Sequence, residues 1–235
     1  MAEVHVLRVF TDAAGNHGNH LGVVLDTAAM TDKQRQAIAA ELGYSETVFV
    51  DDVSGASLRI FTPKIELPLA GHPLVGTAWL LGKLAGAPID TLRPQKASPV
   101  TTWHDEDGTT WICARVEDAP GWGFVQLSTP AEIDALPVPP GPEYGHHSFW
   151  AWLDEPAGLI RARVFASFAG LPEDPATGSA ALRMVAMLGR PITIHQGEGC
   201  IIHARPAQDG YADVGGFVVE DAGRIVEATR PETLD

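Results

Sequence analysis

Short runs of apolar and β-branched residues recur along the chain and predict a protein rich in β-strands. Glycine, proline, asparagine and aspartate separate these runs and predict turns between them. In the amino-terminal part, strands are expected at Val4–Phe10, Leu21–Leu25, Glu46–Val50, Leu58–Thr62, Val100–His104, Thr110–Val116 and Phe124–Ser128. The pattern then recurs, with strands expected at Phe149–Leu153, Arg161–Phe165, Ile192–His195, Cys200–His203, Tyr211–Val214 and Phe217–Val219.

Two segments are apolar almost all round, which is typical of helices buried on every side. They are Pro73–Ala85 and Pro175–Leu188, and each starts with a proline. Proline suits the start of a helix because it lacks an N–H group that would go unsatisfied there. A third helix, with one apolar and one polar side, is expected after Thr31. The spacing of Thr31 and Gln34 is that of a capping box, and Gly43 provides the stop.

The stretch Thr129–Gly145 contains five prolines and is expected to be an irregular connection. We therefore predict two half-domains, residues 1–128 and 149–235, joined by a connection at residues 129–148. Each half gathers its strands around one buried helix, so the expected fold class is α+β.

Acidic residues outnumber basic ones by 30 to 16 in this chain of 235 residues, which gives a formal net charge of −14. A surface of this sign repels phosphate groups, so nucleic acids and anionic membranes are not expected as partners. A small anionic metabolite is compatible with the charge, because a local group of backbone N–H donors is enough to hold it.

The two cysteines, Cys113 and Cys200, form no Cys-x-x-Cys pair, and we expect both to be reduced thiols of the core. Residues Met1–His5 lack the basic and apolar regions of a signal peptide. No apolar run reaches the length needed to span a membrane. These features lead us to expect a cytoplasmic protein.

The two buried helices start with related sequences. Gly71–Ala78 reads Gly-His-Pro-Leu-Val-Gly-Thr-Ala, and Glu173–Ala180 reads Glu-Asp-Pro-Ala-Thr-Gly-Ser-Ala. The shared pattern is x-x-Pro-x-x-Gly-Ser/Thr-Ala, with every matched position 102 residues apart. An internal repeat of this kind indicates two similar structural units.

Each helix start is a candidate anion-binding site. The first N–H groups of a helix have no intrahelical partner and carry partial positive charge. Glycine lets a ligand approach the backbone closely, and serine or threonine adds a hydroxyl donor. The candidate substrate-binding residues are therefore Gly76, Thr77, Thr177, Gly178 and Ser179.

A residue able to exchange protons stands just before each proline, His72 in one half and Asp174 in the other. Either segment alone is explained by the start of a buried helix. The two segments together, with a titratable residue at the same offset, favour a site. By pattern alone, Glu46 is an ordinary carboxylate at the end of a strand.

Several segments resemble the PhzF family of phenazine biosynthesis, within the diaminopimelate-epimerase-like fold. The matching segments are Ser45–Val50, Ile60–Pro63, Glu66–Ala78, Glu173–Ala181, Gln196-Gly197 and Arg205-Pro206. The chain departs from the family in the turn Gly15–His20, where Gly-Asn-Pro is usual, and it is shorter than typical members around Thr129–Phe149.

The resemblance implies two barrel-like half-domains, each wrapped around a buried helix, with the active site between them. It also implies a homodimer that uses no metal and no organic cofactor. The namesake enzyme isomerises a dihydro-hydroxyanthranilate. By resemblance, Glu46 is the proton shuttle and His72 and Asp174 are the other catalytic residues. Ser45, Gly71, Gly178 and Ser179 belong to the same site.

We therefore expect a cofactor-independent isomerase that transfers a proton on a small metabolite carrying a carboxylate. A general base that can return the proton as an acid suits this chemistry. Two alternatives stay open: a non-catalytic binding protein of the same fold, and an amino-acid epimerase that does not use cysteine. A two-thiol racemase is set aside because Cys113 and Cys200 are expected to lie away from both helix starts. A metal enzyme is disfavoured, because loop histidines without a ligand pattern are usually solvated. The histidines concerned are His17, His20, His146 and His147.

Overall fold

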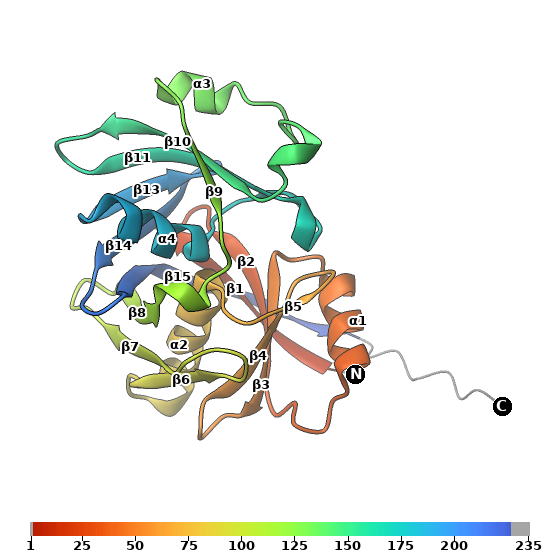
Figure 1. Ribbon diagram of the computed structural model, residues 1–235. Helices are drawn as coiled ribbons and strands as arrows, with labels where there is room; N and C mark the ends of the chain where they lie inside the picture. Colours follow the sequence, from red (N-terminus) through yellow and green to blue (C-terminus); the bar gives the residue numbers. More distant parts are fainter. Residues whose placement is uncertain (1, 227–235) are drawn as a thin grey trace.

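The computed structural model describes residues 2–226 and shows a β-rich protein in two halves (Figure 1). The α-helices are α1 (Asp32–Leu42), α2 (Gly71–Ala85), α3 (Pro130–Asp134) and α4 (Gly178–Leu188). The strands of the first half are β1 (Ala2–Thr11), β2 (Asn19–Val24), β3 (Glu46–Asp52), β4 (Ser57–Phe61), β5 (Glu66–Leu67), β6 (Thr91–Pro94), β7 (Val100–His104) and β8 (Thr110–Arg115). The remaining strands are β9 (Gly123–Gln126), β10 (His147–Asp154), β11 (Leu159–Ala166), β12 (Leu171–Asp174), β13 (Ile192–Gln196), β14 (Cys200–Pro206) and β15 (Tyr211–Val226).

The first half is a closed barrel around α2. Its strands follow the order β1-β2-β3-β4-β6-β7-β8-β15, and β15 pairs with β1 to complete the ring. The start of β15 pairs with β8, with Tyr211 opposite Arg115, and its later part pairs with β1, with Thr11 opposite Phe217. Leu74, from α2, is fully buried inside this ring. Because the ring is closed, its strands leave no free sheet edge, and they enclose α2.

The second half continues the same sheet around α4, in the order β15-β14-β13-β11-β10-β9. Figure 1 shows α4 in the upper half of the molecule and α2 in the lower half. The two strand-wrapped helices confirm the predicted α+β fold class. The division at residues 128 and 149 stays a prediction. Two strands pair with the half to which they do not belong in the sequence. β9 pairs with β10 of the second half, and β15 completes the first barrel.

Both buried helices begin away from the positions predicted by their prolines. Helix α2 begins at Gly71, two residues before Pro73, and α4 begins at Gly178, three residues after Pro175. The segment before α4 is instead strand β12, whose Asp174 pairs with Val164 of β11. The repeated prolines therefore do not occupy equivalent positions in the two helices.

Other differences from the predicted elements are local. The connection expected to be irregular contains α3, which Thr129 caps through a capping box with Glu132. Strand β15 is continuous where Gly215 and Gly216 indicated a break between two strands. The capping box of α1 at Thr31 is confirmed. Within residues 2–226 no helix has the length and hydropathy that a membrane crossing would require.

Candidate active site

Glu46 and His72 form a buried pair between β3 and α2. Glu46 is the first residue of β3, and His72 is the second residue of α2. The Glu46 Oε2 atom lies 2.8 Å from His72 Nδ1, and the two residues are 7% and 1% exposed. His72 Nε2 has no hydrogen-bond partner among residues 2–226. Glu46 is therefore not the exposed strand-end carboxylate that the pattern alone indicates.

Asp174 comes from the second half and is also buried, at the end of β12. Its Oδ1 atom accepts hydrogen bonds from Asn19 Nδ2 at 2.8 Å and Ser45 Oγ at 2.9 Å. Its Oδ2 atom accepts one from Thr177 Oγ1 at 2.6 Å. Asn19 and Ser45 belong to the first half, so the Asp174 carboxylate joins the two halves.

Burial raises the pKa of Asp174 to about 6, and the negative charge of Glu46 acts in the same direction. The hydrogen bond from Thr177 lowers this pKa, but it does not offset the burial. A carboxyl group whose pKa lies near the working pH can both take up and release a proton. This property is typical of groups at functional sites.

The raised pKa of Asp174 has a consequence for stability. Between its unfolded pKa and about 6, the folded state binds more protons at this group than the unfolded state does. Its contribution to stability is therefore largest at low pH and is lost as the pH rises through 6. We expect the stability of the wild type relative to Asp174→Asn to be greater at pH 5 than at pH 7, by on the order of 1 kcal/mol. Urea unfolding of both proteins at the two pH values measures this difference, and a difference that does not change with pH would contradict it.

The two helix starts touch through their glycines. A methyl group added at Gly178 would lie 2.7 Å from Gly71 Cα, and one added at Gly71 would lie 2.8 Å from Gly178 Cα. The first backbone hydrogen bond of α2 runs from Leu74 N–H to Ala70 O, and that of α4 runs from Ala181 N–H to Thr177 O. The N–H groups that precede them, including those of Gly71 and Gly178, are available to a bound anion.

A glutamine holds the start of α4 in place. Gln196, at the end of β13, donates from Nε2 to Asp174 O at 2.8 Å and to Thr177 Oγ1 at 2.9 Å. Its Oε1 atom accepts from Thr177 N–H at 3.1 Å. Both the N–H group and the hydroxyl group of Thr177 therefore have protein partners. The role of Thr177 as a hydrogen-bond donor to a ligand stays a prediction.

The remaining predicted binding residues fall into two groups. Ser45 and Ser179 lie at the site, since Ser45 contacts Asp174 and Ser179 is the second residue of α4. Gly76 and Thr77 instead lie inside α2, because the helix begins five residues before Gly76. A methyl group at Gly76 would lie 2.5 Å from Leu21 Cδ2, so this glycine lets α2 pack against the barrel wall. The Thr77 hydroxyl is buried and has no hydrogen-bond partner among residues 2–226, and substrate binding by these two positions stays a prediction.

Pattern analysis missed two residues that touch the site. Asn19 lies in the segment Gly15–His20, whose departure from the usual Gly-Asn-Pro does not single out this residue. Trp122 donates from Nε1 to Ser179 Oγ at 3.1 Å. Trp122 lies between two glycines in a segment without periodicity, so no local signal singles it out.

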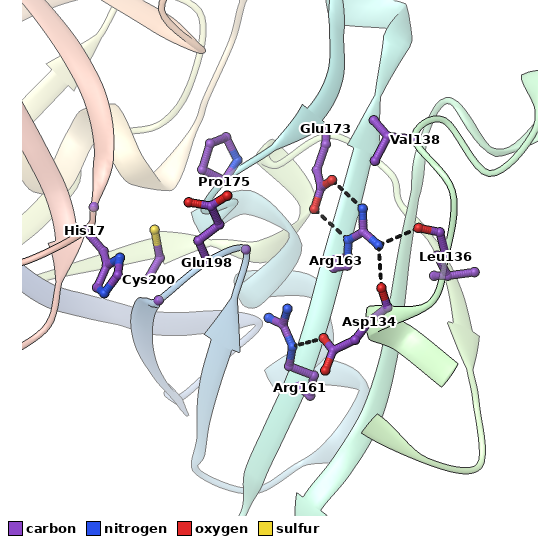
Figure 2. Close-up of a pocket in the computed structure, with 13 residues that line it drawn as sticks. His17, Asp134, Leu136, Val138, Arg161, Arg163, Glu173, Pro175, Glu198 and Cys200 are labelled. Carbon is purple, nitrogen blue, oxygen red and sulfur yellow. Dashed lines mark hydrogen bonds and ion pairs between the residues drawn. The ribbon is translucent and has the colours of Figure 1, made fainter. Parts of the chain in front are cut away.

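A cavity of 690 Å³ lies beside the Asp174 segment. Its lining includes Glu173 and Pro175, which flank Asp174, but not Glu46 or His72. Figure 2 shows that its two arginines already have partners: Arg163 binds Glu173 and Arg161 binds Asp134. We therefore place the chemistry at the buried pair and the helix starts rather than in this cavity.

Neither cysteine suits a proton-transfer role near neutral pH. Cys200 lines the same cavity as Pro175, so it lies closer to the second motif than predicted. Burial raises the pKa of Cys200 to about 11 and that of Cys113 to about 12. Both thiols therefore stay protonated, and both are free of disulfides.

The loop histidines are spread over different surroundings. His17 lines the cavity described above, and His20 stacks on Tyr44. His146 packs against Trp122, and His147 packs against Tyr144. In the part of the chain that the structure describes, no three histidine, cysteine, aspartate or glutamate side chains gather as metal ligands. Independence from metals and cofactors stays a prediction.

Comparisons with known proteins identify the family of this chain. The family model of phenazine biosynthesis-like proteins, PhzC-PhzF, matches residues 7–136. A trans-2,3-dihydro-3-hydroxyanthranilate isomerase of Pseudomonas chlororaphis is 31% identical over 77% of this chain and 78% of its own length. An uncharacterized isomerase of Pasteurella multocida is 39% identical over 43% of this chain, and the match spans only about a third of that relative, 36%.

The fold has a close counterpart among solved structures. A PhzF-family phenazine biosynthesis protein of Bacillus anthracis superposes with a TM-score of 0.76. The match covers 96% of this chain and 99% of the other, at 21% identity, so it supports the fold alone. The family model matches more than half of the chain, and the curated relatives are isomerases. The chain therefore belongs to the phenazine biosynthesis-like (PhzC-PhzF) family and is an enzyme of the isomerase class.

Proposed function

We propose that this isomerase moves a proton on a small metabolite that carries a carboxylate, without a metal or an organic cofactor. The contact between Glu46 Oε2 and His72 Nδ1 carries the proposal. It gives a buried carboxylate a fixed orientation at the point where the two helix starts meet. A general base that is already oriented loses no further rotational freedom when it takes up a proton from the substrate.

Each group has a separate task in the proposed reaction. Glu46 takes a proton from one carbon of the substrate, and the electron pair of the broken C–H bond shifts along the conjugated system. The same carboxyl group returns the proton to another carbon, so the product is an isomer with the same atoms. The N–H groups at the starts of α2 and α4 hold the substrate carboxylate and stabilise negative charge that develops during the shift.

His72 and Asp174 complete the acid–base set. The Nδ1 atom of His72 holds the Glu46 carboxylate, while its Nε2 atom, which has no partner within residues 2–226, is left to a bound ligand. Burial raises the pKa of Asp174 to about 6, so about a tenth of the molecules carry a proton on this carboxylate at pH 7. The negative charge of Glu46 also raises the pKa of Asp174, so a change at Glu46 should alter the pH dependence that Asp174 contributes.

The first substrate to test is trans-2,3-dihydro-3-hydroxyanthranilate, because the Pseudomonas chlororaphis relative is named for it. The protein is dialysed against a strong chelator, loss of metal is checked by elemental analysis, and the reaction is run in deuterated water. We expect isomerisation to persist. Deuterium should enter the product at one carbon to the extent that the Glu46 carboxyl group exchanges its proton with the solvent before returning it. Loss of activity that a divalent cation restores would contradict the cofactor-free mechanism.

The same experiment separates the proposal from a non-catalytic binding protein of this fold. A binding protein would retain the ligand without exchanging its carbon-bound hydrogen for deuterium. A cysteine-independent amino-acid epimerase would instead exchange the α-hydrogen of an amino acid, which a panel of amino acids in deuterated water tests. We also propose a homodimer in the cytoplasm, and analytical ultracentrifugation checks the dimer.

A further inference from the structure

Trp122 makes a contact with the candidate site that no predicted role explains. It lies just before β9, and its indole Nε1 donates a hydrogen bond to Ser179 Oγ at 3.1 Å. Ser179 is the second residue of α4 and is buried. Trp122 thus reaches from the segment between the halves to the helix start that faces the substrate carboxylate in the proposed reaction.

The direction of this hydrogen bond determines what Ser179 can do. An indole N–H only donates, while a serine hydroxyl has one hydrogen to donate and two lone pairs that accept. Because Trp122 occupies an acceptor position of Ser179, the hydroxyl hydrogen points away from the indole. No acceptor for that hydrogen occurs among residues 2–226, so it is free to bind an anion.

Packing from two segments holds the Trp122 ring in place. The His146 ring packs edge-on to it with centroids 4.5 Å apart, and the Phe168 ring does so at 6.0 Å. His146 and Phe168 also contact each other at 4.1 Å. The backbone beside the ring is fixed too, since Gly123 N–H donates to His146 O at 3.1 Å. A side chain held this way is a rigid donor.

We infer that Trp122 is a positioning residue, which directs the Ser179 hydroxyl hydrogen toward the carboxylate of the bound substrate. This inference rests on the proposed function, because that function places a carboxylate at the start of α4. A hydroxyl that is already oriented loses less rotational freedom on binding than one that rotates freely. The effect of Trp122 on affinity must therefore pass through Ser179.

The test uses anthranilate, a planar carboxylate, and its uncharged analogue 2-aminobenzamide as probes in isothermal titration calorimetry. Ser179→Ala should weaken anthranilate binding about 10-fold, because a hydrogen bond to a charged group is lost. Trp122→Phe keeps a ring but removes the N–H group, and should weaken it about 5-fold. The double variant should bind no more weakly than Ser179→Ala, and 2-aminobenzamide should lose less affinity than anthranilate. Trp152→Phe is the matched control, because Trp152 is half-buried and makes no hydrogen bond within residues 2–226.

A second measurement needs no ligand. The indole proton of Trp122, identified by the loss of its NMR signal in Trp122→Phe, should shift in Ser179→Ala. An unchanged signal would overturn the inference. An equal loss of affinity for both probes would also overturn it, as would additive effects of the two substitutions on anthranilate affinity. Failure of the wild type to bind anthranilate would overturn the proposed carboxylate substrate, on which the inference rests, even with the NMR shift present.

Discussion

Glu46→Gln is expected to lower kcat by about 1,000-fold or more, within the range that a positioned general base contributes. Glutamine has the shape of glutamate, and its amide oxygen can still accept a hydrogen bond from His72 Nδ1. It cannot take up the proton that leaves the substrate carbon. Turnover of trans-2,3-dihydro-3-hydroxyanthranilate, with appearance of the isomer as the readout, measures the loss.

The matched control for this variant is Glu41→Gln, since Glu41 is an exposed carboxylate on α1. It should leave kcat unchanged. Anthranilate affinity and the unfolding transition of Glu46→Gln should stay close to those of the wild type, because the side chain keeps its volume. A Glu46→Gln variant with wild-type kcat would show that another group, with Asp174 the first to examine, moves the proton.

Gly178→Ala is expected to destabilise the fold and to abolish most of the activity. The added methyl group would lie 2.7 Å from both Gly71 Cα and His72 N, which are backbone atoms that cannot move aside cheaply. Overpacking of this kind costs about 2 kcal/mol, which corresponds to a fall in Tm of about 6 °C for a chain of this size. The helix starts would also move apart, and a displacement of about 1 Å at a catalytic site can cost about 100-fold in rate.

Gly82→Ala is the control for this variant. Gly82 also lies in a buried helix, but the atoms nearest to an added methyl group are 3.5 Å away, an ordinary contact distance. Alanine is also the better helix former, so Gly82→Ala should keep or raise the Tm. Differential scanning calorimetry compares the variants. Equal Tm values for Gly178→Ala and the wild type would mean that the two helix starts are not in close contact.

The hydrophobic pattern predicts most of the fold, because strands and buried helices leave a local signal. Thr31 and Gln34 marked the start of α1 correctly, through a capping box that depends only on neighbouring residues. The start of α4 was misplaced, because the pairing of Asp174 with Val164 continues strand β12 almost to the helix. The hydrophobic pattern also does not predict that the first barrel closes, because no residue near Thr11 indicates that Phe217 is its partner.

The site was predictable only in part, for a related reason. The repeat drew attention to His72 and Asp174, which the structure brings to one place from the two halves. It also assigned binding to Gly76, because sequence alignment equates Gly76 with Gly178 although only Gly178 starts a helix. Glu46 came from family resemblance, since its burial depends on α2, which follows it in the sequence. Asn19 and Trp122 contact residues that lie more than 50 positions away in the sequence, and no local pattern predicts such contacts.

The pairing of β15 with β1 also constrains when the molecule can fold. Synthesis produces β1 first, but its hydrogen-bonding partner emerges from the ribosome some two hundred residues later. Until then, one edge of β1 is unpaired, and α2 has no complete barrel around it. Contacts between segments so far apart in sequence slow folding, and unpaired strand edges favour association with other chains. The first barrel is therefore the later of the two halves to become self-contained, and its nascent form is exposed to aggregation until β15 has been made.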